Sequence, residues 1–186
     1  MAAPLDFYTA DMVRELNERS PRNGPRYETV HGELLVSPAP RMAHQEAAFR
    51  LARAIADYLD REPVGHAFMS PADVSWGERD ILAQPDVFVV PTAETLGWSW
   101  TRIRHLLLAV EVLSPSSVRA DRFTKRRLYQ EQGVPLYWMV DVDGGVVEVW
   151  TPEAHEARSE RETLIWHPLR ASAPFTLLLA ELFSGI

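Results

Sequence analysis

One carboxylate interrupts an apolar segment near the middle of the chain. Residues 106–113 read Leu-Leu-Leu-Ala-Val-Glu-Val-Leu, so Glu111 stands among seven apolar residues in what the pattern predicts to be a strand buried on both faces. Burying an ionised carboxylate is costly unless it is paired, hydrogen-bonded or bound to a cation, or unless its pKa rises. Glu111 therefore either pairs with an arginine, lies at a strand end near the surface, or takes part in chemistry.

A second carboxylate, Asp86, opens the apolar segment 86–90 directly after Pro85. Aspartate after proline is also common turn chemistry, so Asp86 gains weight only together with Glu111. Neighbouring strands could bring the two carboxylates to about 4 Å from each other. At that distance and an effective dielectric near 20, their charges would repel by ~4 kcal/mol. A divalent cation relieves this repulsion, and oxygen-only ligation favours Mg²⁺ or Mn²⁺ over a structural zinc.

The segment after Glu111 carries a third group that could do chemistry. Asp121, Lys125 and Tyr129 are spaced by four residues, which places them on one face of a helix and allows an ion pair between the first two. Lys125 is the single lysine beside 18 arginines. Its compact ammonium group would suit contact with a reacting phosphoryl group.

The same segment is strongly basic. Five cations lie within residues 119–127, although the chain has a formal net charge of -7. Such a run is commonly a solvated helix face, and the alternative is a patch that contacts phosphates. For the second interpretation the candidate substrate-binding residues are Arg119, Arg122 and Arg126.

Length and composition limit the architecture. With 186 residues, 46% of them hydrophobic, the chain suits a single domain over 1–186, in which 1–25 form a leading helix and a linker. Without cysteine it has no disulfides or thiolate zinc ligands. No apolar run approaches the roughly 18 residues of a membrane span, so we expect a cytoplasmic protein with no membrane partner.

Hydrophobic periodicity predicts the elements that must position these residues. Apolar residues spaced by three and four indicate a helix from Met42 to about Arg61, and a second helix is expected from about Ser117 to Gln132. A short helix over 9–19, with Thr9 as its N-cap, precedes a hairpin whose turn is His31-Gly32. The expected strands are 67–69, 74–76, 86–90, 106–113, 136–142 and 146–150. The predicted class is a mixed α/β (α+β) fold with helices covering a central sheet.

Several motifs, taken together, resemble a known family. They are Gly32-Glu33-Leu34, His44-Gln45, Pro85-Asp86, Glu-Val-Leu-Ser-Pro-Ser over 111–116, Asp121 to Lys125, and Gly-Val-Pro-Leu-Tyr-Trp-Met-Val-Asp over 133–141. In this combination the chain resembles a bacterial restriction endonuclease family of the PD-(D/E)XK nuclease superfamily. The resemblance covers nearly the whole chain.

The resemblance implies a restriction endonuclease-like fold, with a central mixed β-sheet flanked by helices. It further implies Mg²⁺-dependent (or Mn²⁺-dependent) cleavage of phosphodiester bonds in DNA, and it suggests a homodimer. The metal would be held by Asp86, Glu111 and the carbonyl of Val112, with Lys125 as a catalytic residue. Lysine usually follows the glutamate by two residues in this superfamily, where this chain has Leu113, and the family pattern places it on the next helix instead.

Two further residues, Glu33 and His44, match family positions near the site. Glu33 is also typical of a solvated strand residue, and His44 of a helix cap or a surface residue. The leading hypothesis is thus a metal-dependent endonuclease. The alternative is a non-catalytic binding or assembly module that retains the nuclease-like fold, because fold does not dictate function.

Overall fold

The computed structural model describes residues 7–21, 23–115 and 117–186. The first six residues of the expected leading segment and Ser116 of the Ser-Pro-Ser motif therefore lie outside the described residues. Within the described ranges, no helix has both the length and the apolar character needed to cross a membrane.

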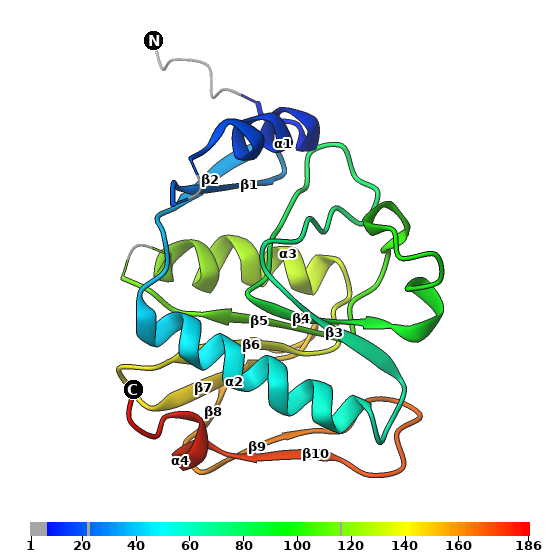
Figure 1. Cartoon of the computed structure of the whole chain (residues 1–186), viewed down its shortest axis with the longest axis vertical. Helices are drawn as coiled ribbons and strands as arrows, with labels where there is room; N and C mark the ends of the chain where they lie inside the picture. Colours follow the sequence, from blue (N-terminus) through cyan, green and yellow to red (C-terminus); the bar gives the residue numbers. More distant parts are fainter. Residues whose placement is uncertain (1–6, 22, 116) are drawn as a thin grey trace.

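A six-stranded mixed sheet forms the centre of the protein (Figure 1). Its strands, in spatial order, are β3 (Gly65–Met69), β4 (Val87–Pro91), β5 (Leu108–Val112), β6 (Tyr137–Asp141), β7 (Val146–Trp150) and β8 (Arg158–Glu160). Neighbours are antiparallel except β5 and β6, which run parallel. The connection between these two parallel strands is the helical segment that carries Lys125, as a parallel pair requires a crossover.

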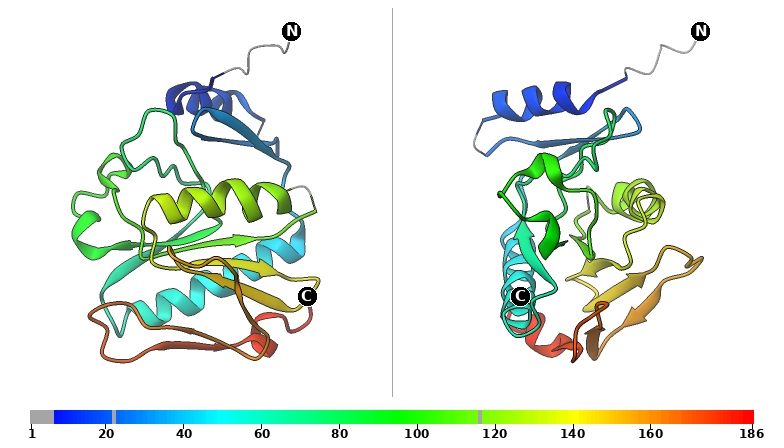
Figure 2. Two further views of the ribbon diagram at one scale, coloured as in Figure 1. Left: turned by 180° about the vertical axis from the view of Figure 1, so that it is seen from behind. Right: turned by 90° about the vertical axis from the view of Figure 1, so that its right-hand side faces the viewer.

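The two faces of the sheet are covered by different helices. Helix α2 (Met42–Leu59) packs on one face, and α3 (Arg126–Glu131) covers the other (Figure 2). Because side chains alternate along a strand, Val110 of β5 faces α2, whereas Ala109 and Glu111 face α3. This alternation places the glutamate on the side from which the crossover segment approaches.

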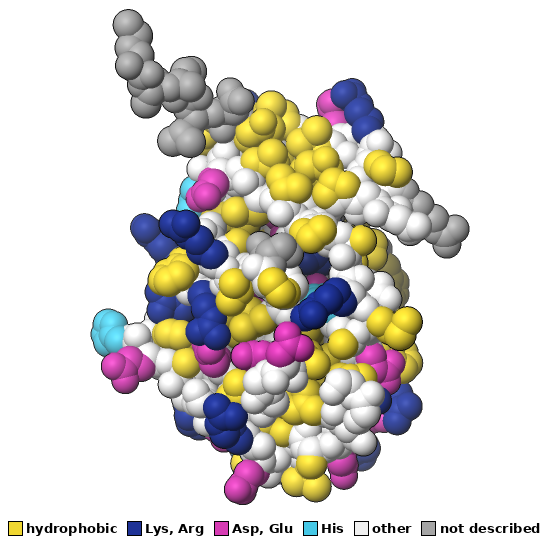
Figure 3. Space-filling model, turned by 90° about the vertical axis from the view of Figure 1, so that its left-hand side faces the viewer, with side chains coloured by type: hydrophobic (Ala, Val, Ile, Leu, Met, Phe, Trp, Pro, Cys, Tyr) yellow, Lys and Arg dark blue, Asp and Glu magenta, His cyan; other side chains and the backbone are white. Residues whose placement is uncertain are grey.

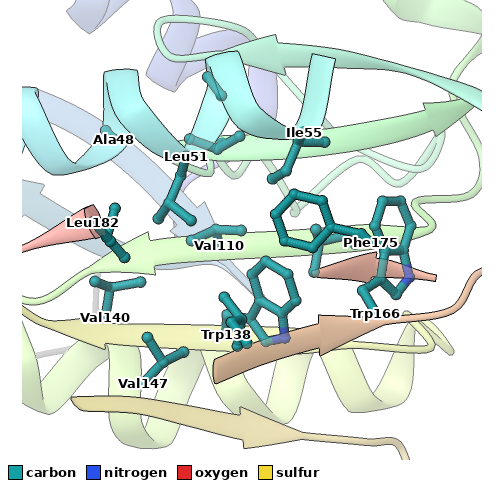
Figure 4. Close-up of a cluster of buried hydrophobic side chains, with 14 of the residues drawn as sticks. Ala48, Leu51, Ile55, Val110, Trp138, Val140, Val147, Trp166, Phe175 and Leu182 are labelled. Atoms are coloured by element: carbon teal, nitrogen blue, oxygen red, sulfur yellow. The ribbon is translucent and has the colours of Figure 1, made fainter. Parts of the chain in front are cut away.

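The α2 face holds a continuous apolar core (Figure 4). Leu51 and Ile55 of α2 lie against Val110 and Trp138 of the sheet, and all four side chains are fully buried. The C-terminal elements β9 (Thr163–Trp166), β10 (Phe175–Leu178) and α4 (Leu179–Leu182) close the end of this core. This packing fixes α2, and with it the position of the residues in its first turn.

A separate hairpin lies over the α3 side of the molecule. Strands β1 (Arg26–Val30) and β2 (Glu33–Ser37) are joined by His31 and Gly32, with φ of 51° and 80°, the left-handed values of a tight two-residue turn. Helix α1 (Ala10–Arg19) packs on this hairpin, and Thr9 caps it by accepting the Met12 N–H at 3.3 Å. Both the expected hairpin and the expected leading helix are confirmed.

Two details differ from the sequence predictions. The expected strand 74–76 is reduced to one bridge, Val74 with Ala83, because the left-handed backbone of Trp76 (φ 50°) ends the extended conformation. The expected regular helix after residue 117 begins instead with a π-helical segment, Ala120–Lys125, which runs into α3. Two short 3₁₀ turns, Thr92–Glu94 and Trp100–Arg102, complete the connection between β4 and β5.

Candidate active site

The start of β4 and the end of β5 bring Asp86 and Glu111 to the same end of the sheet. Val87 pairs with Val110, and Pro85 has no N–H to donate to the next ladder position. The Asp86 side chain supplies an acceptor at this point, since its Oδ2 accepts the Val112 N–H at 2.8 Å. N–H and C=O of one strand residue point to the same neighbouring strand, so the Val112 carbonyl also points toward the Asp86 side.

Lys125 joins Glu111 from the crossover segment. Its Nζ lies 2.9 Å from Oε1 of Glu111 and 3.6 Å from Oδ1 of Asp121. The Tyr129 hydroxyl donates to the same Glu111 oxygen at 2.7 Å. All four side chains are buried. The four-residue spacing seen in the sequence therefore does place Asp121, Lys125 and Tyr129 on one face, and that face is turned toward β5.

The sequence interpretation missed Glu28 of β1, which is the most deeply buried acid of this group. Glu28 is 0% exposed; its Oε2 lies 2.9 Å from Lys125 Nζ, and its Oε1 accepts the Gln84 N–H at 2.7 Å. Residues 26–30 read Arg-Tyr-Glu-Thr-Val, which is ordinary for a solvated hairpin. The available signal was that Arg26 and Glu28, two charges spaced by two, must share one face of a strand.

Asp86 is held by two further groups. Arg26 donates from Nη1 to Asp86 Oδ1 at 3.2 Å and to Ser70 Oγ at 2.9 Å. His44, in the first turn of α2, places Nε2 3.1 Å from Asp86 Oδ2. The structure thus brings His44 to the cluster, and the apolar α2 core described above fixes its approach.

A cavity of about 220 Å³ opens onto these groups. Asp86, Glu111, Val112, Asp121 and His44 line it, together with Gly24, Arg26, the 37–41 loop, Ser114, Pro115 and Ser117. The face in Figure 3 shows charged and histidine side chains around and within a hollow that hydrophobic side chains border. A small anionic group could therefore reach the carboxylates from solvent.

Burial and neighbouring charges move the pKa values of the two strand acids in opposite directions. Burial acts to raise the pKa of Asp86, but the hydrogen bond from His44 and the charge of Arg26 outweigh it and lower the pKa well below its usual value. For Glu111, burial raises the pKa well above its usual value; Lys125 opposes this rise, and the three neighbouring carboxylates add to it. Asp86 is thus ionised at neutral pH, whereas the positive charge near Glu111 is too small to offset the effect of burial on its pKa.

The lysine shows the complementary behaviour. Burial acts to lower its pKa, yet the charges of Glu111, Glu28 and Asp121 outweigh burial and raise the pKa of Lys125 above its usual value. Lys125 is therefore a cation at neutral pH. It can stabilise negative charge and hold a hydrogen-bond acceptor, whereas service as a neutral base would require the loss of these partners.

Four other residues suggested by the sequence lie outside the cluster. Glu33 is exposed at the turn end of the hairpin and borders a different cavity. Arg122 pairs with Glu148 at 2.6 Å, and the Arg126 guanidinium lies 4.6 Å above the centre of the Trp150 ring. Arg119 is exposed and does not line the 220 Å³ cavity.

The donor set fits a divalent cation that keeps much of its water. Within the described ranges, no group of three or more acidic, histidine or cysteine side chains is arranged to hold a metal ion. Mg²⁺ nevertheless binds through one or two carboxylates plus water and substrate oxygens. Asp86, Glu111 and the Val112 carbonyl could supply such a set, and nearby Asp121 Oδ1 is a buried oxygen without a hydrogen-bond donor.

Charge balance supports the same assignment. The cluster contains four carboxylates, Glu28, Asp86, Glu111 and Asp121, against the two permanent cations Arg26 and Lys125. Two negative charges remain when all six groups are ionised. A divalent cation would neutralise both charges. It would also lower the pKa of Glu111 and so favour the ionised form of this side chain.

Comparisons with known proteins agree with this architecture. The model of a family described as "Uma2: Putative restriction endonuclease" matches residues 13–178. A crystal structure of a protein from Anabaena variabilis, described as a putative nuclease belonging to DUF820, superposes with a TM-score of 0.74, covering 95% of this chain and 98% of that chain at 22% identity. At this identity the similarity shows the fold, and the predicted fold is confirmed. No curated protein matches the chain.

Proposed function

This chain belongs to the Uma2 family of restriction endonuclease-like proteins, and from that premise we propose that it is a metal-dependent nuclease that hydrolyses phosphodiester bonds in DNA. The observation that carries the proposal is the meeting of Asp86 and Glu111 at one cavity, with the Lys125 ammonium group bound to Glu111 behind the cavity wall. These residues come from two strands and a helix, and folding has to remove all three from water. Such a costly arrangement is expected where chemistry requires it.

In the proposed site, Asp86, Glu111 and the Val112 carbonyl bind Mg²⁺ or Mn²⁺. The cation supplies Lewis-acid polarisation of the phosphate and lowers the pKa of a water molecule that attacks it. The hydrogen bonds from Val112 N–H and His44 hold the Asp86 carboxylate in a fixed orientation. The protein thereby presents one carboxylate whose pKa is lowered, Asp86, beside one whose pKa burial raises, Glu111.

Lys125 provides a permanent positive charge behind Glu111, within the cluster that borders the cavity. Its ammonium group is fixed by Glu111 and Glu28, both at 2.9 Å, so little reorganisation is needed when negative charge develops on the phosphate. Glu28 acts as a positioning residue, because it contacts Lys125 and not the cavity. His44 lines the same cavity and contacts Asp86, so it acts as a second positioning residue, for that carboxylate.

The direct test is cleavage by the purified protein. Supercoiled plasmid and single-stranded DNA would be incubated with Mg²⁺ or Mn²⁺ and with wild-type protein, Glu111→Ala or Lys125→Ala. We expect nicked or cut products with the wild type only. Equal cleavage by all three proteins would assign the activity to a contaminant or to another site.

A non-catalytic binding or assembly module is the second candidate, and one contact favours it. Arg26 binds Asp86 Oδ1 at 3.2 Å, so a guanidinium lies on an oxygen that a metal would use. Manganese titration followed by calorimetry separates the two candidates. Saturable manganese binding that is lost in Asp86→Ala supports the nuclease. If the protein shows no manganese binding that depends on Asp86, the result supports the non-catalytic module.

A further inference from the structure

The helical segment that carries Lys125 has a second row of functional side chains on its outer surface. The inner row is buried and consists of Asp121, Lys125 and Tyr129. The outer row has the same four-residue spacing and consists of Arg119, Phe123 and Arg127, all exposed. The two rows are offset by two residues, close to half a helical turn, so they face in opposite directions.

Phe123 is a large apolar side chain that folding leaves in water. It is 63% exposed and borders a cavity of about 480 Å³, whose other lining residues are Val30, His31, Glu33, Thr124 and Arg127. Burying a phenylalanine side chain contributes about 1.5–3 kcal/mol to the stability of a fold. Because Phe123 is mostly exposed, it provides only a small part of this free energy. An exposed ring of this kind indicates a surface that another molecule covers.

The two arginines beside Phe123 remain available to a ligand. Arg127 uses only Nε to contact Glu131, at 2.7 Å, and its side chain is 76% exposed. Arg119 forms no ion pair with any residue of the described ranges. Figure 3 shows Lys and Arg side chains gathered with hydrophobic ones beside the hollow, on a protein whose net charge is -7. Charge complementarity here therefore favours an anionic occupant with flat apolar faces.

We propose that Arg119, Phe123 and Arg127 bind an unpaired stretch of nucleic acid, with one base stacked on Phe123 and the flanking phosphates on the two arginines. At the α-helical rise of about 1.5 Å per residue, eight residues separate the arginines by at most ~12 Å, with a smaller rise over the wider π-helical stretch, and a base could lie between two phosphates over this span. Stacking on an aromatic ring requires a base that is free of its partner strand. This assignment rests on the proposed nuclease function and gives its substrate a single-stranded segment.

The position of the row connects it to the catalytic cavity. Ser117 and Asp121 line the 220 Å³ cavity and lie on the same segment as Arg119 and Phe123. Ser117 belongs to the inner row and Arg119 to the outer one, so a strand whose phosphate enters this cavity would have to pass around the N-terminal end of the segment to reach Arg119 and Phe123.

Fluorescence anisotropy with labelled oligonucleotides, measured with a chelator to prevent cleavage, tests this surface. Phe123→Ala is expected to weaken binding of single-stranded DNA by about fivefold to a hundredfold, with little effect on a duplex of the same sequence. Arg119→Gln and Arg127→Gln are each expected to reduce the slope of log affinity against log salt by about 0.7. Gel filtration of each variant monitors its oligomeric state.

Helix α2 offers matched controls on the opposite face of the sheet. Phe49 is 52% exposed and Arg53 is exposed four residues later, so Phe49→Ala and Arg53→Gln remove the same chemistry elsewhere. Both should bind single-stranded DNA like the wild type. Three results would each overturn the proposal. They are wild-type affinity in Phe123→Ala, an equal loss of affinity in Phe49→Ala, and a change of oligomeric state as the only effect of Phe123→Ala.

A substrate without bases separates this inference from the nuclease proposal. Bis(p-nitrophenyl) phosphate needs the metal site for hydrolysis and has no flanking nucleotides that could join that site to the outer row, so Phe123→Ala should hydrolyse it like the wild type. If wild-type protein binds single-stranded DNA through Phe123 but hydrolyses neither substrate, the nuclease proposal fails and the binding surface stands. If the small substrate is hydrolysed but Phe123→Ala binds DNA normally, only the binding surface fails.

Discussion

Lys125 Nζ lies 2.9 Å from Oε1 of Glu111, although the two residues are 14 positions apart in the sequence. The connection from β5 to β6 turns back over the sheet and places its helical segment above the glutamate. The first part of that segment is the π-helix Ala120–Lys125, which is wider than an α-helix. Lys125 thus reaches Glu111 from a part of the backbone other than the strand that carries the glutamate.

The buried lysine should contribute strongly to stability. Lys125→Met removes the cation shared by Glu111, Glu28 and Asp121, and we expect the free energy of unfolding to fall by about 3–5 kcal/mol because buried carboxylates lose their partner. Urea denaturation measures this change.

A double variant distinguishes loss of the ion pair from loss of packing. Adding Glu28→Gln to Lys125→Met removes one of the buried carboxylates that have lost their cation. The double variant should therefore be more stable than Lys125→Met alone. A double variant that is less stable than Lys125→Met would show that the Glu28–Lys125 contact contributes little.

Glu28 should matter for activity, whereas Glu33 should not. Glu28→Gln weakens the hold on Lys125, and we expect cleavage to slow by about 10–100-fold, as is typical when an outer partner of a metal site is lost. Glu33→Gln is the matched control on the same hairpin; because Glu33 borders the Phe123 surface, the comparison uses bis(p-nitrophenyl) phosphate, which Glu33→Gln should hydrolyse like the wild type. The reverse order of activities would contradict the assignment.

The sequence predicted most of the architecture because its apolar patterns are strong. The helix from Met42 was marked by buried residues every three to four positions, and β4 to β7 by dense β-branched and aromatic runs. The extent of the π-helix could not be predicted, since it depends on how the segment packs over β5. Periodicity alone is compatible with a regular helix there.

The candidate site was only partly predictable, as the two hairpin glutamates show. Glu28 pairs with Leu35, and Glu33 is two residues from Leu35, so both glutamates share one face of the hairpin. Glu28 lies in the middle of that face over Lys125, and Glu33 lies at the exposed turn end. Which of them meets the helix depends on the docking of the hairpin, a long-range contact that no local pattern encodes.

The Tyr129 hydroxyl should help to hold Glu111. Tyr129→Phe leaves Glu111 Oε1 with one donor fewer, and we expect a loss of about 1–3 kcal/mol in the free energy of unfolding, together with slower cleavage. Tyr58→Phe is the control: its hydroxyl donates at 2.7 Å to the Ala173 carbonyl, far from the cluster in sequence and on the α2 side. If both variants cleaved DNA equally well, Tyr129 would have no role in positioning.

Returning the lysine to the strand should restore part of the activity. The N–H of Leu113 donates to the Val140 carbonyl at 2.8 Å, so the strand geometry continues to this residue, and its side chain packs on the same face as Glu111. Leu113→Lys combined with Lys125→Met should therefore cleave faster than Lys125→Met alone. Single-turnover cleavage measures this, with thermal melting to establish that both variants fold.

The most direct measurement is a crystal structure of the protein grown with Mn²⁺ and recorded at a wavelength where manganese scatters anomalously. We predict one anomalous peak in the 220 Å³ cavity, within coordination distance of both Asp86 and Glu111, with Arg26 moved off Asp86 Oδ1. Absence of a peak between the two acids at saturating manganese, with Arg26 still bound to Asp86, would contradict the account.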